Sequence, residues 1–427
     1  MAKLLIRGGR IVDPASGFDK TADLLIANGI VRRIAERISA PEAETIDAHG
    51  LVVAPGFIDM HVHLREPGFV HAETIETGAR AAAAGGFTSV ACMPNTNPVN
   101  DSAHVTRYIV ERAQRDAAVN VFPIGAITKG SLGEELAAIG GMKRAGIVAI
   151  SDDGKPVMNA RVMRRAMETA RAHGLVVIDH CEDLHLSAGG DMHEGLRSIE
   201  LGLGGIPGCS EDVMVARDII LAEVTGARYH VAHLSTKRSI ELVAEGKRRG
   251  LPVTCEVSPH HFTLSDSEIA AYDSNYKMKP PIRCQHDVAA CIAGIADGTV
   301  DALATDHAPH AGSEKMQEFE RCPFGILGLE TAIGLTFERL VHPGVIPLTR
   351  MIELYTTGPA RILGIHRGTL QPGSAGDVTI LDPQRRWKYE NSKSASKSRN
   401  SPFDGREFVG GATHTVVAGE VVWTART

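Results

Sequence analysis

The sequence is poor in several features that mark whole classes of protein. Aromatic residues make up only 4% of its 427 residues, and 45 Lys and Arg against 51 Asp and Glu leave a net charge of −6. We therefore expect neither the basic surface nor the aromatic stacking residues of a nucleic-acid-binding protein. The seven cysteines are scattered and include no Cys-x-x-Cys pair, which excludes a disulfide scaffold and a thiolate zinc finger.

Long hydrophobic runs are also missing. The first ten residues, MAKLLIRGGR, contain an apolar run of three, and no uncharged apolar stretch approaches the roughly 18 residues of a membrane span. We therefore expect a soluble, cytoplasmic protein that binds no membrane. Histidine, by contrast, is abundant, with 19 residues, so the positions of the histidines become the question.

The middle of the chain alternates short apolar runs with segments of helical composition. This alternation is typical of parallel βα units, and eight such units are what a (β/α)₈ TIM-type barrel requires. A doubly wound open sheet is the alternative. The eight runs are Leu51–Ile58, Thr88–Met93, Val119–Ile124, Ile147–Ser151, Leu175–Ile178, Ala227–Val231, Pro252–Val257 and Ala302–Ala304.

The two ends of the chain resemble each other more than either resembles the middle. Both read as short strands joined by turns such as Asn28-Gly29, a pattern that indicates antiparallel hairpins. We therefore predict an α/β protein in which residues 1–50 and 366–427 form one small discontinuous β-sandwich domain. We expect residues 51–365 to form the barrel, which would carry any catalytic site.

Histidine and aspartate follow five of the eight predicted strands. Since the chemistry of parallel α/β folds lies beyond the carboxyl ends of the strands, these side chains are expected to converge. His61 and His63 are two residues apart, so on an extended segment both rings face one side. The full set is His61, His63, Asp153, His180, His233 and Asp306.

Four imidazoles and two carboxylates are ligands suited to two Zn²⁺ or similar divalent ions. Two cations held close together need an anionic bridge, which Asp153 and a shared hydroxide supply. Such a hydroxide is available at neutral pH because metal binding lowers the pKa of water to about 7.

Several segments closely resemble the dihydroorotase family, and specifically its type I bacterial branch, within the amidohydrolase superfamily. The pairing of MPNT with DHAPH is specific to this family, whereas the His-x-His pair marks only the superfamily. The matching segments are Val53–Gly68, Met93–Thr96, His180–Asp183, Ala304–His310, Pro323–Thr331 and Ser396–Pro402.

The resemblance implies a role for each of the six residues. His61 and His63 match the ligands of the more buried metal, and His180 and His233 match those of the second. Asp306 matches the aspartate that binds metal and shuttles the proton. Asp153 stands where many amidohydrolases carry a carboxylated lysine, and the nearby Lys155 is assigned a structural or loop role.

The resemblance also implies how the substrate is held. Arg65 matches the arginine that binds the dihydroorotate carboxylate, for which a planar guanidinium is well suited. Asn95 and His310 match further substrate contacts, and backbone groups near Phe324 and Gly325 match the loop that touches the ring.

One position departs from the pattern of bacterial relatives, which usually read Lys-x-Asn-Pro-Pro. This chain has Lys279 in place of that substrate-binding asparagine. A second cation near the substrate carboxylate is chemically sensible, and the alternative is a lysine that faces solvent. We also expect His260, His261 and Cys181 to pack or to bond within loops, although they lie close to predicted ligands.

The family reaction is the reversible interconversion of L-dihydroorotate and N-carbamoyl-L-aspartate in de novo pyrimidine (UMP) biosynthesis. The resemblance implies attack by the metal-bridging hydroxide, with Asp306 moving the proton to the ring nitrogen. It also suggests a homodimer and a complex with aspartate carbamoyltransferase.

Two other functions remain open on the sequence alone. One is another cyclic amidohydrolase, namely a dihydropyrimidinase, hydantoinase or allantoinase; Asp153, Arg65 and the MPNT segment favour the acidic substrate dihydroorotate instead. The other is a non-catalytic homologue that only scaffolds aspartate carbamoyltransferase. A scaffold is expected to have lost metal ligands, and this sequence keeps all six.

Overall fold

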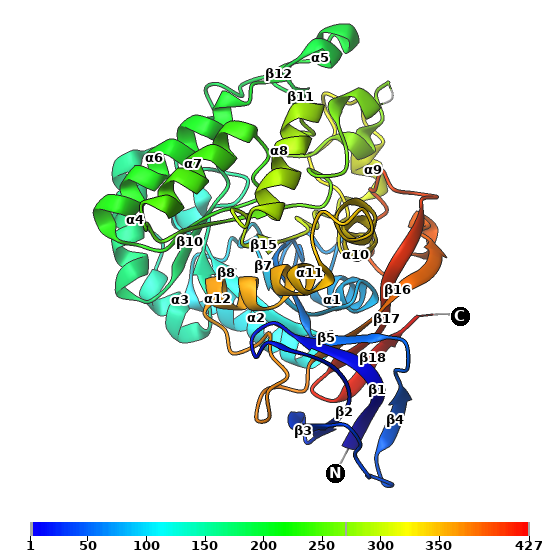
Figure 1. The fold of residues 1–427 in the computed structure, drawn as a ribbon. Helices are drawn as coiled ribbons and strands as arrows, with labels where there is room; N and C mark the ends of the chain where they lie inside the picture. The colour runs from blue at the N-terminus through cyan, green and yellow to red at the C-terminus, as the bar shows by residue number, and fades with distance from the viewer. Residues whose placement is uncertain (1–2, 270, 426–427) are drawn as a thin grey trace.

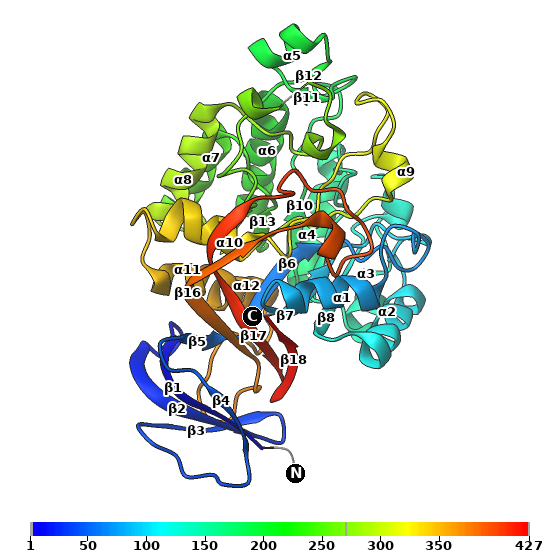
Figure 2. The same ribbon diagram turned by 90° about the vertical axis from the view of Figure 1, so that its right-hand side faces the viewer.

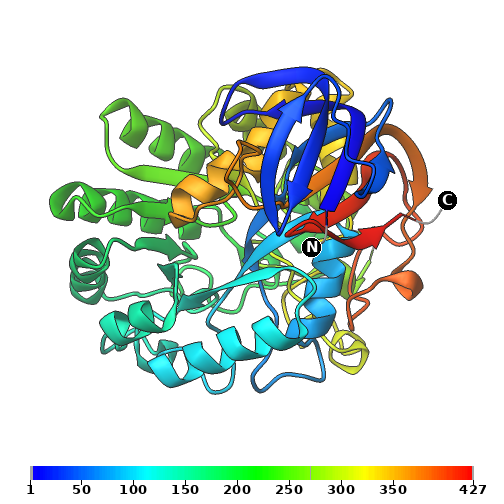
Figure 3. The ribbon, with the colours of Figure 1, turned by 90° about the horizontal axis from the view of Figure 1, so that it is seen from below.

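The protein consists of a barrel and a smaller β domain attached to one side of it (Figure 1). The computed structural model describes residues 3–269 and 271–425. Seen from below, helices surround the barrel strands, while the first strands of the chain lie over one side (Figure 3). None of the helices in these residues is both long and apolar enough to cross a lipid bilayer.

Eight parallel strands form the barrel sheet in the order β15-β14-β13-β10-β9-β8-β7-β6. A bridge between Val62 of β6 and His307, four residues beyond β15, links the two edges, so the sheet is nearly closed. The predicted barrel is therefore confirmed, and the doubly wound open sheet is excluded. The strands are β6 (Phe57–Val62), β7 (Phe87–Cys92), β8 (Asn120–Gly125), β9 (Ala149–Ile150), β10 (Val176–Asp179), β13 (Tyr229–Val231), β14 (Val253–Val257) and β15 (Ala302–Leu303).

Helices follow these strands and cover the outside of the barrel. Polar side chains fix several helix starts: the Asn159 side chain accepts hydrogen bonds from the first backbone N–H groups of α4, and Thr236 does the same for α7. The helices are α1 (Ile75–Ala84), α2 (Ala103–Asp116), α3 (Ile139–Ala145), α4 (Ala160–Ala172), α5 (Leu196–Leu201), α6 (Cys209–Thr225), α7 (Lys237–Arg248), α8 (Gln285–Ala296), α9 (Gly312–Lys315), α10 (Ala332–Thr336), α11 (Leu348–Tyr355) and α12 (Thr357–Leu363).

The β domain draws its strands from both ends of the chain, as predicted. Its sheet has the order β18-β17-β16-β5-β1-β2-β3, with β4 paired to β1. Apolar side chains from both chain ends, among them Leu24 and Ile380, share one buried core. The strands are β1 (Lys3–Asp13), β2 (Phe18–Ala27), β3 (Ile30–Ala35), β4 (Glu44–Asp47), β5 (Val52–Pro55), β16 (Val378–Lys388), β17 (Glu407–Val417) and β18 (Glu420–Thr424).

The run Leu51–Ile58, expected to be the first barrel strand, divides between the two sheets. Its first half is β5, which pairs with β1 and β16 of the β domain, and the barrel begins only at β6. The two strands meet at Gly56, where a Cβ atom would lie 2.1 Å from Thr88 Oγ1. Because β5 and β6 are buried along their whole length, no change of pattern marks the boundary.

A short arm projects from the rim of the barrel beyond the fifth barrel strand. It contains a two-stranded sheet of β11 (Met192–His193) and β12 (Gly205–Ile206), with α5 at its tip (Figure 1). A second excursion, between β16 and β17, leaves the β domain and runs toward the barrel near α9 (Figure 2). Both excursions were outside the pattern of βα units expected from sequence.

Candidate active site

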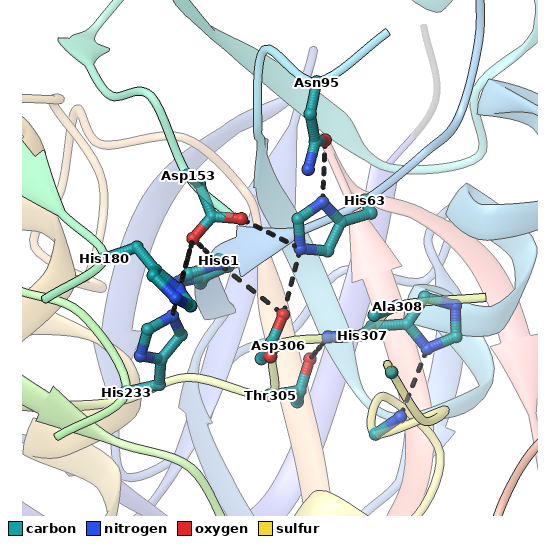
Figure 4. A network of polar contacts seen from close by, with 12 residues as sticks. His61, His63, Asn95, Asp153, His180, His233, Thr305, Asp306, His307 and Ala308 are labelled. Carbon is teal, nitrogen blue, oxygen red and sulfur yellow. Dashed lines mark hydrogen bonds and ion pairs between the residues drawn. The ribbon is translucent and has the colours of Figure 1, made fainter. Parts of the chain in front are cut away.

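Four imidazole rings surround the carboxylate of Asp153 at the carboxyl end of the barrel strands (Figure 4). The Asp153 Oδ1 atom lies 3.4 Å from His61 Nε2, 3.4 Å from His233 Nε2 and 3.6 Å from His180 Nδ1. The Oδ2 atom lies 3.5 Å from His63 Nε2. The four predicted histidines therefore share one carboxylate, in the central position that a bridging ligand requires.

Asp306 completes this cluster from the last barrel strand. Its Oδ1 atom lies 2.9 Å from His63 Nε2 and 3.6 Å from His61 Nε2. The backbone is left-handed at Asp306, with φ 48°, and at His233, with φ 31°. Non-glycine residues adopt this conformation only where the surroundings impose it, often at functional sites. The structure thus brings all six predicted residues together, and each of them is buried.

The ring nitrogens that face away from Asp153 are tied to oxygen atoms in three of the four histidines. His61 Nδ1 donates to Glu256 Oε1 at 2.8 Å, and His63 Nδ1 donates to Asn95 Oδ1 at 2.8 Å. His180 Nε2 donates to Glu182 Oε2 at 2.9 Å. Metal-binding histidines are held in this way, because fixing the proton on one nitrogen presents the lone pair of the other.

Three buried polar atoms of the cluster residues make no hydrogen bond with any described residue. Two of them, His61 Nε2 and Asp153 Oδ1, face each other inside the cluster, and the third is His233 Nδ1, on the far side of its ring. Leaving such atoms unpaired in a protein interior costs about 1–3 kcal/mol each, so an unpaired cluster needs an explanation. A set of imidazole and carboxylate donors with free lone pairs fits divalent metal ions, which account for the two facing atoms.

The charges in the cluster favour a positive occupant. Burial raises the pKa of Asp153, but the facing imidazoles outweigh burial and bring that pKa well below its usual range. Burial lowers the pKa of His180, yet its bonds to Asp153 and Glu182 raise it to about 10. The pocket therefore attracts positive charge, whether this is an imidazolium or a metal cation.

Glu256 is a buried carboxylate that the sequence patterns did not single out. It lies on β14, and its second oxygen accepts from His230 Nε2 at 3.2 Å. Burial raises its pKa, but the hydrogen bonds from His230 and His61 bring the pKa below its usual range. The available signal was an acidic residue inside the otherwise apolar run Pro252–Val257.

Glu182 links the cluster to Lys279. Its Oε1 atom accepts from Lys279 Nζ at 2.7 Å while its Oε2 atom holds His180. The ammonium group also lies 4.8 Å from the centre of the Phe324 ring. Lys279 is thus directed into the site, where it neutralises the carboxylate that orients a predicted metal ligand.

The predicted substrate residues gather beside the cluster of histidines and aspartates. Arg65 Nε donates to the Pro309 carbonyl oxygen at 3.0 Å, and its Nη2 atom lies 3.3 Å from His310 Nε2. His310 Nε2 donates to the Phe324 carbonyl oxygen at 2.8 Å. Burial, followed by the neighbouring Arg65, lowers the pKa of His310 to about 3, so this ring is neutral.

Gly325 lies against the same loop. Its φ of 137° and the crowding of its Cβ position by Ala308 and His310 exclude a larger residue there.

The nearby residues assigned to packing or loops lie outside the cluster. Lys155 is exposed, and His261 donates to the Pro280 carbonyl oxygen at 3.1 Å. Cys181 is buried beside Tyr229 Oη at 3.1 Å, and burial raises the pKa of its thiol well above its usual value. His260 is also buried, and burial lowers its pKa to about 4.

A further group of potential ligands, His193, Cys284 and Asp287, lies apart from this cluster. The Arg283 guanidinium approaches His193 Nδ1 to 3.4 Å, and the two Asp287 oxygens already accept from Cys284 and from the Lys237 backbone. A cation at this position would meet a fixed positive charge, so we assign no metal there.

Comparison with known proteins agrees with this geometry. Residues 50–239 match the dihydro-orotase-like family, and residues 272–423 match the amidohydrolase family. A dihydroorotase of Solibacter usitatus (strain Ellin6076) is 65% identical over 421 residues, which is 99% of this chain and 98% of that protein. A dihydroorotase of Citrifermentans bemidjiense is 54% identical over 423 residues, covering 99% of this chain and 100% of that protein.

Among solved structures, an L-hydantoinase (dihydropyrimidinase) from Arthrobacter aurescens superimposes with a TM-score of 0.88. It is 27% identical, over 99% of this chain and 96% of that one. A D-hydantoinase (dihydropyrimidinase) from Thermus sp. gives a TM-score of 0.82 at 26% identity, over 99% and 97%. These hydantoinase structures share the barrel and the β domain with this chain. The relatives that are more than 50% identical over the full length are named dihydroorotase. The chain belongs to the dihydroorotase family of amidohydrolases.

Proposed function

We propose that the protein is a cytoplasmic dihydroorotase that interconverts L-dihydroorotate and N-carbamoyl-L-aspartate in pyrimidine biosynthesis. The observation that carries the proposal is the ring of four imidazoles around Asp153, with Arg65 in the same pocket. A hydrolytic centre beside a half-buried guanidinium suits a cyclic amide that carries a carboxylate.

We assign two Zn²⁺ ions to the cluster. His61, His63 and Asp306 would hold one ion, His180 and His233 the other, and Asp153 would bridge them. When bound, such ions would supply Lewis-acid chemistry, namely polarisation of a carbonyl group and a lower pKa for water. The assignment is supported by the unpaired His61 Nε2 and Asp153 Oδ1 atoms and by the oxygen partners of the far ring nitrogens.

Asp306 is the group that we assign to proton transfer. In ring opening the carbonyl carbon gains a water oxygen, its bond to the ring nitrogen breaks, and that nitrogen receives a proton. Burial raises the pKa of Asp306, but the His63 hydrogen bond and the neighbouring imidazoles lower it below its usual range. Asp306 is therefore ionised and able to accept a proton from water before passing it on.

Arg65 is the group that we assign to the substrate carboxylate. The Pro309 carbonyl oxygen holds Nε, which fixes the plane of the guanidinium and leaves the terminal N–H groups as donors. Family resemblance supports further substrate contacts. We assign these to Asn95, His310, Lys279 and the backbone at Phe324 and Gly325. Fixing the substrate there contributes to catalysis through orientation.

We place the protein in the type I branch of the family because Asp153 takes the bridging position. The lysine nearest to it in sequence, Lys155, is exposed and outside the cluster, so it is not a candidate for a carboxylated bridging ligand. We also propose a homodimer and a complex with aspartate carbamoyltransferase, for which family membership is the support. Size-exclusion chromatography with light scattering, with and without that enzyme, tests both assemblies.

A second candidate activity is hydrolysis of a neutral ring, as in a hydantoinase, dihydropyrimidinase or allantoinase. The likeness to L-hydantoinase at a TM-score of 0.88 favours it. The deciding assay supplies Zn²⁺-loaded protein with L-dihydroorotate, hydantoin or allantoin and follows ring opening. We expect the highest kcat/KM for L-dihydroorotate; faster turnover of a neutral ring would overturn the proposal, and no turnover of any ring would favour a scaffold.

A further inference from the structure

We propose that Asn400, a residue of the excursion between β16 and β17, is a positioning residue for the substrate loops of the barrel. The inference rests on the proposed function, since it assigns a role in that same site. Figure 2 shows this excursion, in red-orange, leaving the β domain and reaching the barrel near α9. The β domain would thereby complete the active site rather than only cap the barrel.

The Asn400 side chain joins the two loops that carry the predicted substrate contacts. Its Nδ2 group donates to the carbonyl oxygens of Ala308 at 3.1 Å and Gly325 at 3.0 Å. Its Oδ1 atom accepts from the backbone N–H of His310 at 3.1 Å. Its own carbonyl oxygen accepts from the Leu327 backbone at 2.8 Å. One buried residue therefore bonds both loops at four points.

An asparagine is required for this pattern of hydrogen bonds. The site uses two donors and one acceptor on a short planar group, which among side chains of this size only the asparagine amide supplies. An aspartate of the same shape keeps the acceptor, loses both donors and places negative charge against two carbonyl oxygens. The residue is 3% exposed, so water cannot easily replace the lost bonds.

The same loops are also braced from the other side. Lys315, on α9, donates through Nζ to the carbonyl oxygens of Pro323 at 3.0 Å and Gly325 at 3.2 Å. The His310 ring in turn holds the Phe324 carbonyl oxygen. Loss of the Asn400 bonds would thus loosen the His310 backbone and the link between the two loops, while Lys315 still holds the loop of Pro323 and Gly325.

The excursion has its own anchors, independent of Asn400. The Lys397 backbone donates to Glu73 Oε1 at 3.0 Å, and Ser396 Oγ also donates to Glu73. Ser398 Oγ donates to the Ala72 carbonyl oxygen at 2.6 Å. None of the six predicted metal ligands contacts Asn400 among the hydrogen bonds of the described residues. A substitution at Asn400 should therefore alter the substrate loops and leave the metal cluster in place.

The test compares Asn400→Asp and Asn400→Ala with the wild type as full-length, Zn²⁺-loaded protein. A displacement of substrate contacts by about 1 Å costs on the order of 100-fold in efficiency. We expect kcat/KM for L-dihydroorotate to fall by about that factor, mainly through KM. Bound zinc per chain should stay close to wild type, and the lost buried hydrogen bonds should lower Tm without unfolding the protein at the assay temperature. Unchanged kcat/KM, or a loss accompanied by zinc release, would overturn the inference.

The matched control is Asn391→Ala, an asparagine of the same excursion whose Nδ2 group donates to the Ser401 carbonyl oxygen and reaches neither loop. We expect its KM to stay near wild type; a KM rise equal to that of Asn400→Asp would contradict a specific role.

The wild-type arm separates this inference from the proposed function. If the wild-type protein does not open the dihydroorotate ring, the proposed function is wrong. Amide hydrogen exchange then tests whether Asn400 positions the two loops. Faster exchange of residues 308–310 and 323–327 in Asn400→Asp, with exchange near His61 unchanged, would support the positioning role. Equal exchange in the two proteins would contradict it.

Discussion

The proposed metal cluster and the proposed substrate pocket lie side by side but are built in different ways. Every predicted metal ligand lies at the end of a barrel strand or a few residues beyond it, on elements whose places the barrel fixes. Arg65, His310 and Gly325 lie on loops, and a segment of the β domain bonds those loops. A rigid scaffold therefore holds the chemistry, while loops that can vary hold the specificity.

Replacing Asp306 by Asn should have the largest effect, because it removes the group that we assign to proton transfer. The amide cannot accept a proton, so we expect kcat to fall by about 100- to 10,000-fold. Circular dichroism and Tm should stay near wild type. Near-normal turnover in this variant would remove Asp306 from the proton path.

Arg65→Lys should damage the substrate side alone. A lysine cannot form the paired hydrogen bonds of a guanidinium, so we expect kcat/KM for L-dihydroorotate to fall by about 10- to 100-fold, mainly through KM. Zinc content should not change. An unaltered KM would show that another residue binds the carboxylate.

Glu256→Gln should do the reverse and damage the metal side alone. Loss of a carboxylate that orients a metal-binding histidine typically costs about 10- to 100-fold in metal affinity. We expect that loss in a zinc competition titration, with KM unchanged once zinc saturates the protein. A rise in KM at saturating zinc would show that the two regions are coupled through His61.

Lys279→Met should have a smaller effect that falls on both regions, since Lys279 bonds Glu182 and lies over Phe324. We expect a rise in KM of a few-fold, of the order that a partly exposed ion pair supports. The control is Lys155→Met, on an exposed loop. An unchanged apparent affinity for dihydroorotate would return Lys279 to a surface role.

His260 should affect acid stability rather than activity. Its folded pKa is about 4, against about 6.5 in an unfolded chain. As pH falls from about 6.5 toward 4, the unfolded state binds the proton first, so the free energy of unfolding decreases. His260→Gln should flatten this decrease in urea titrations at several pH values. If the free energy of unfolding of the variant decreases as steeply with pH as that of the wild type, other groups cause the decrease.

The barrel and the candidate ligands could be predicted from the sequence because functional side chains of parallel sheets lie at the carboxyl ends of the strands. Seven of the eight predicted strands coincide with barrel strands to within two residues at each end. The boundary between β5 and β6 at Gly56 was not predicted. Both strands are fully buried, so no alternation of apolar and polar residues separates them.

The partners of the ligands were harder to predict. The role of Glu256 is recognisable only once the His61 ring is in place, since it depends on a contact across the barrel. Glu182 lies two residues from His180, but its bond to that ring depends on the fold of the loop. Asn400 is 90 residues from His310 in sequence, and its segment reads as a polar loop. Long-range contacts of this kind leave no periodic signal in one sequence.

The central claim is that a two-metal cluster in this protein opens a cyclic amide bearing a carboxylate. Protein purified without chelator should be analysed for metals and assayed on the same sample with L-dihydroorotate. The account predicts about two divalent ions per chain, turnover that a chelator abolishes, and recovery on addition of Zn²⁺. Full turnover after complete removal of metal would contradict it.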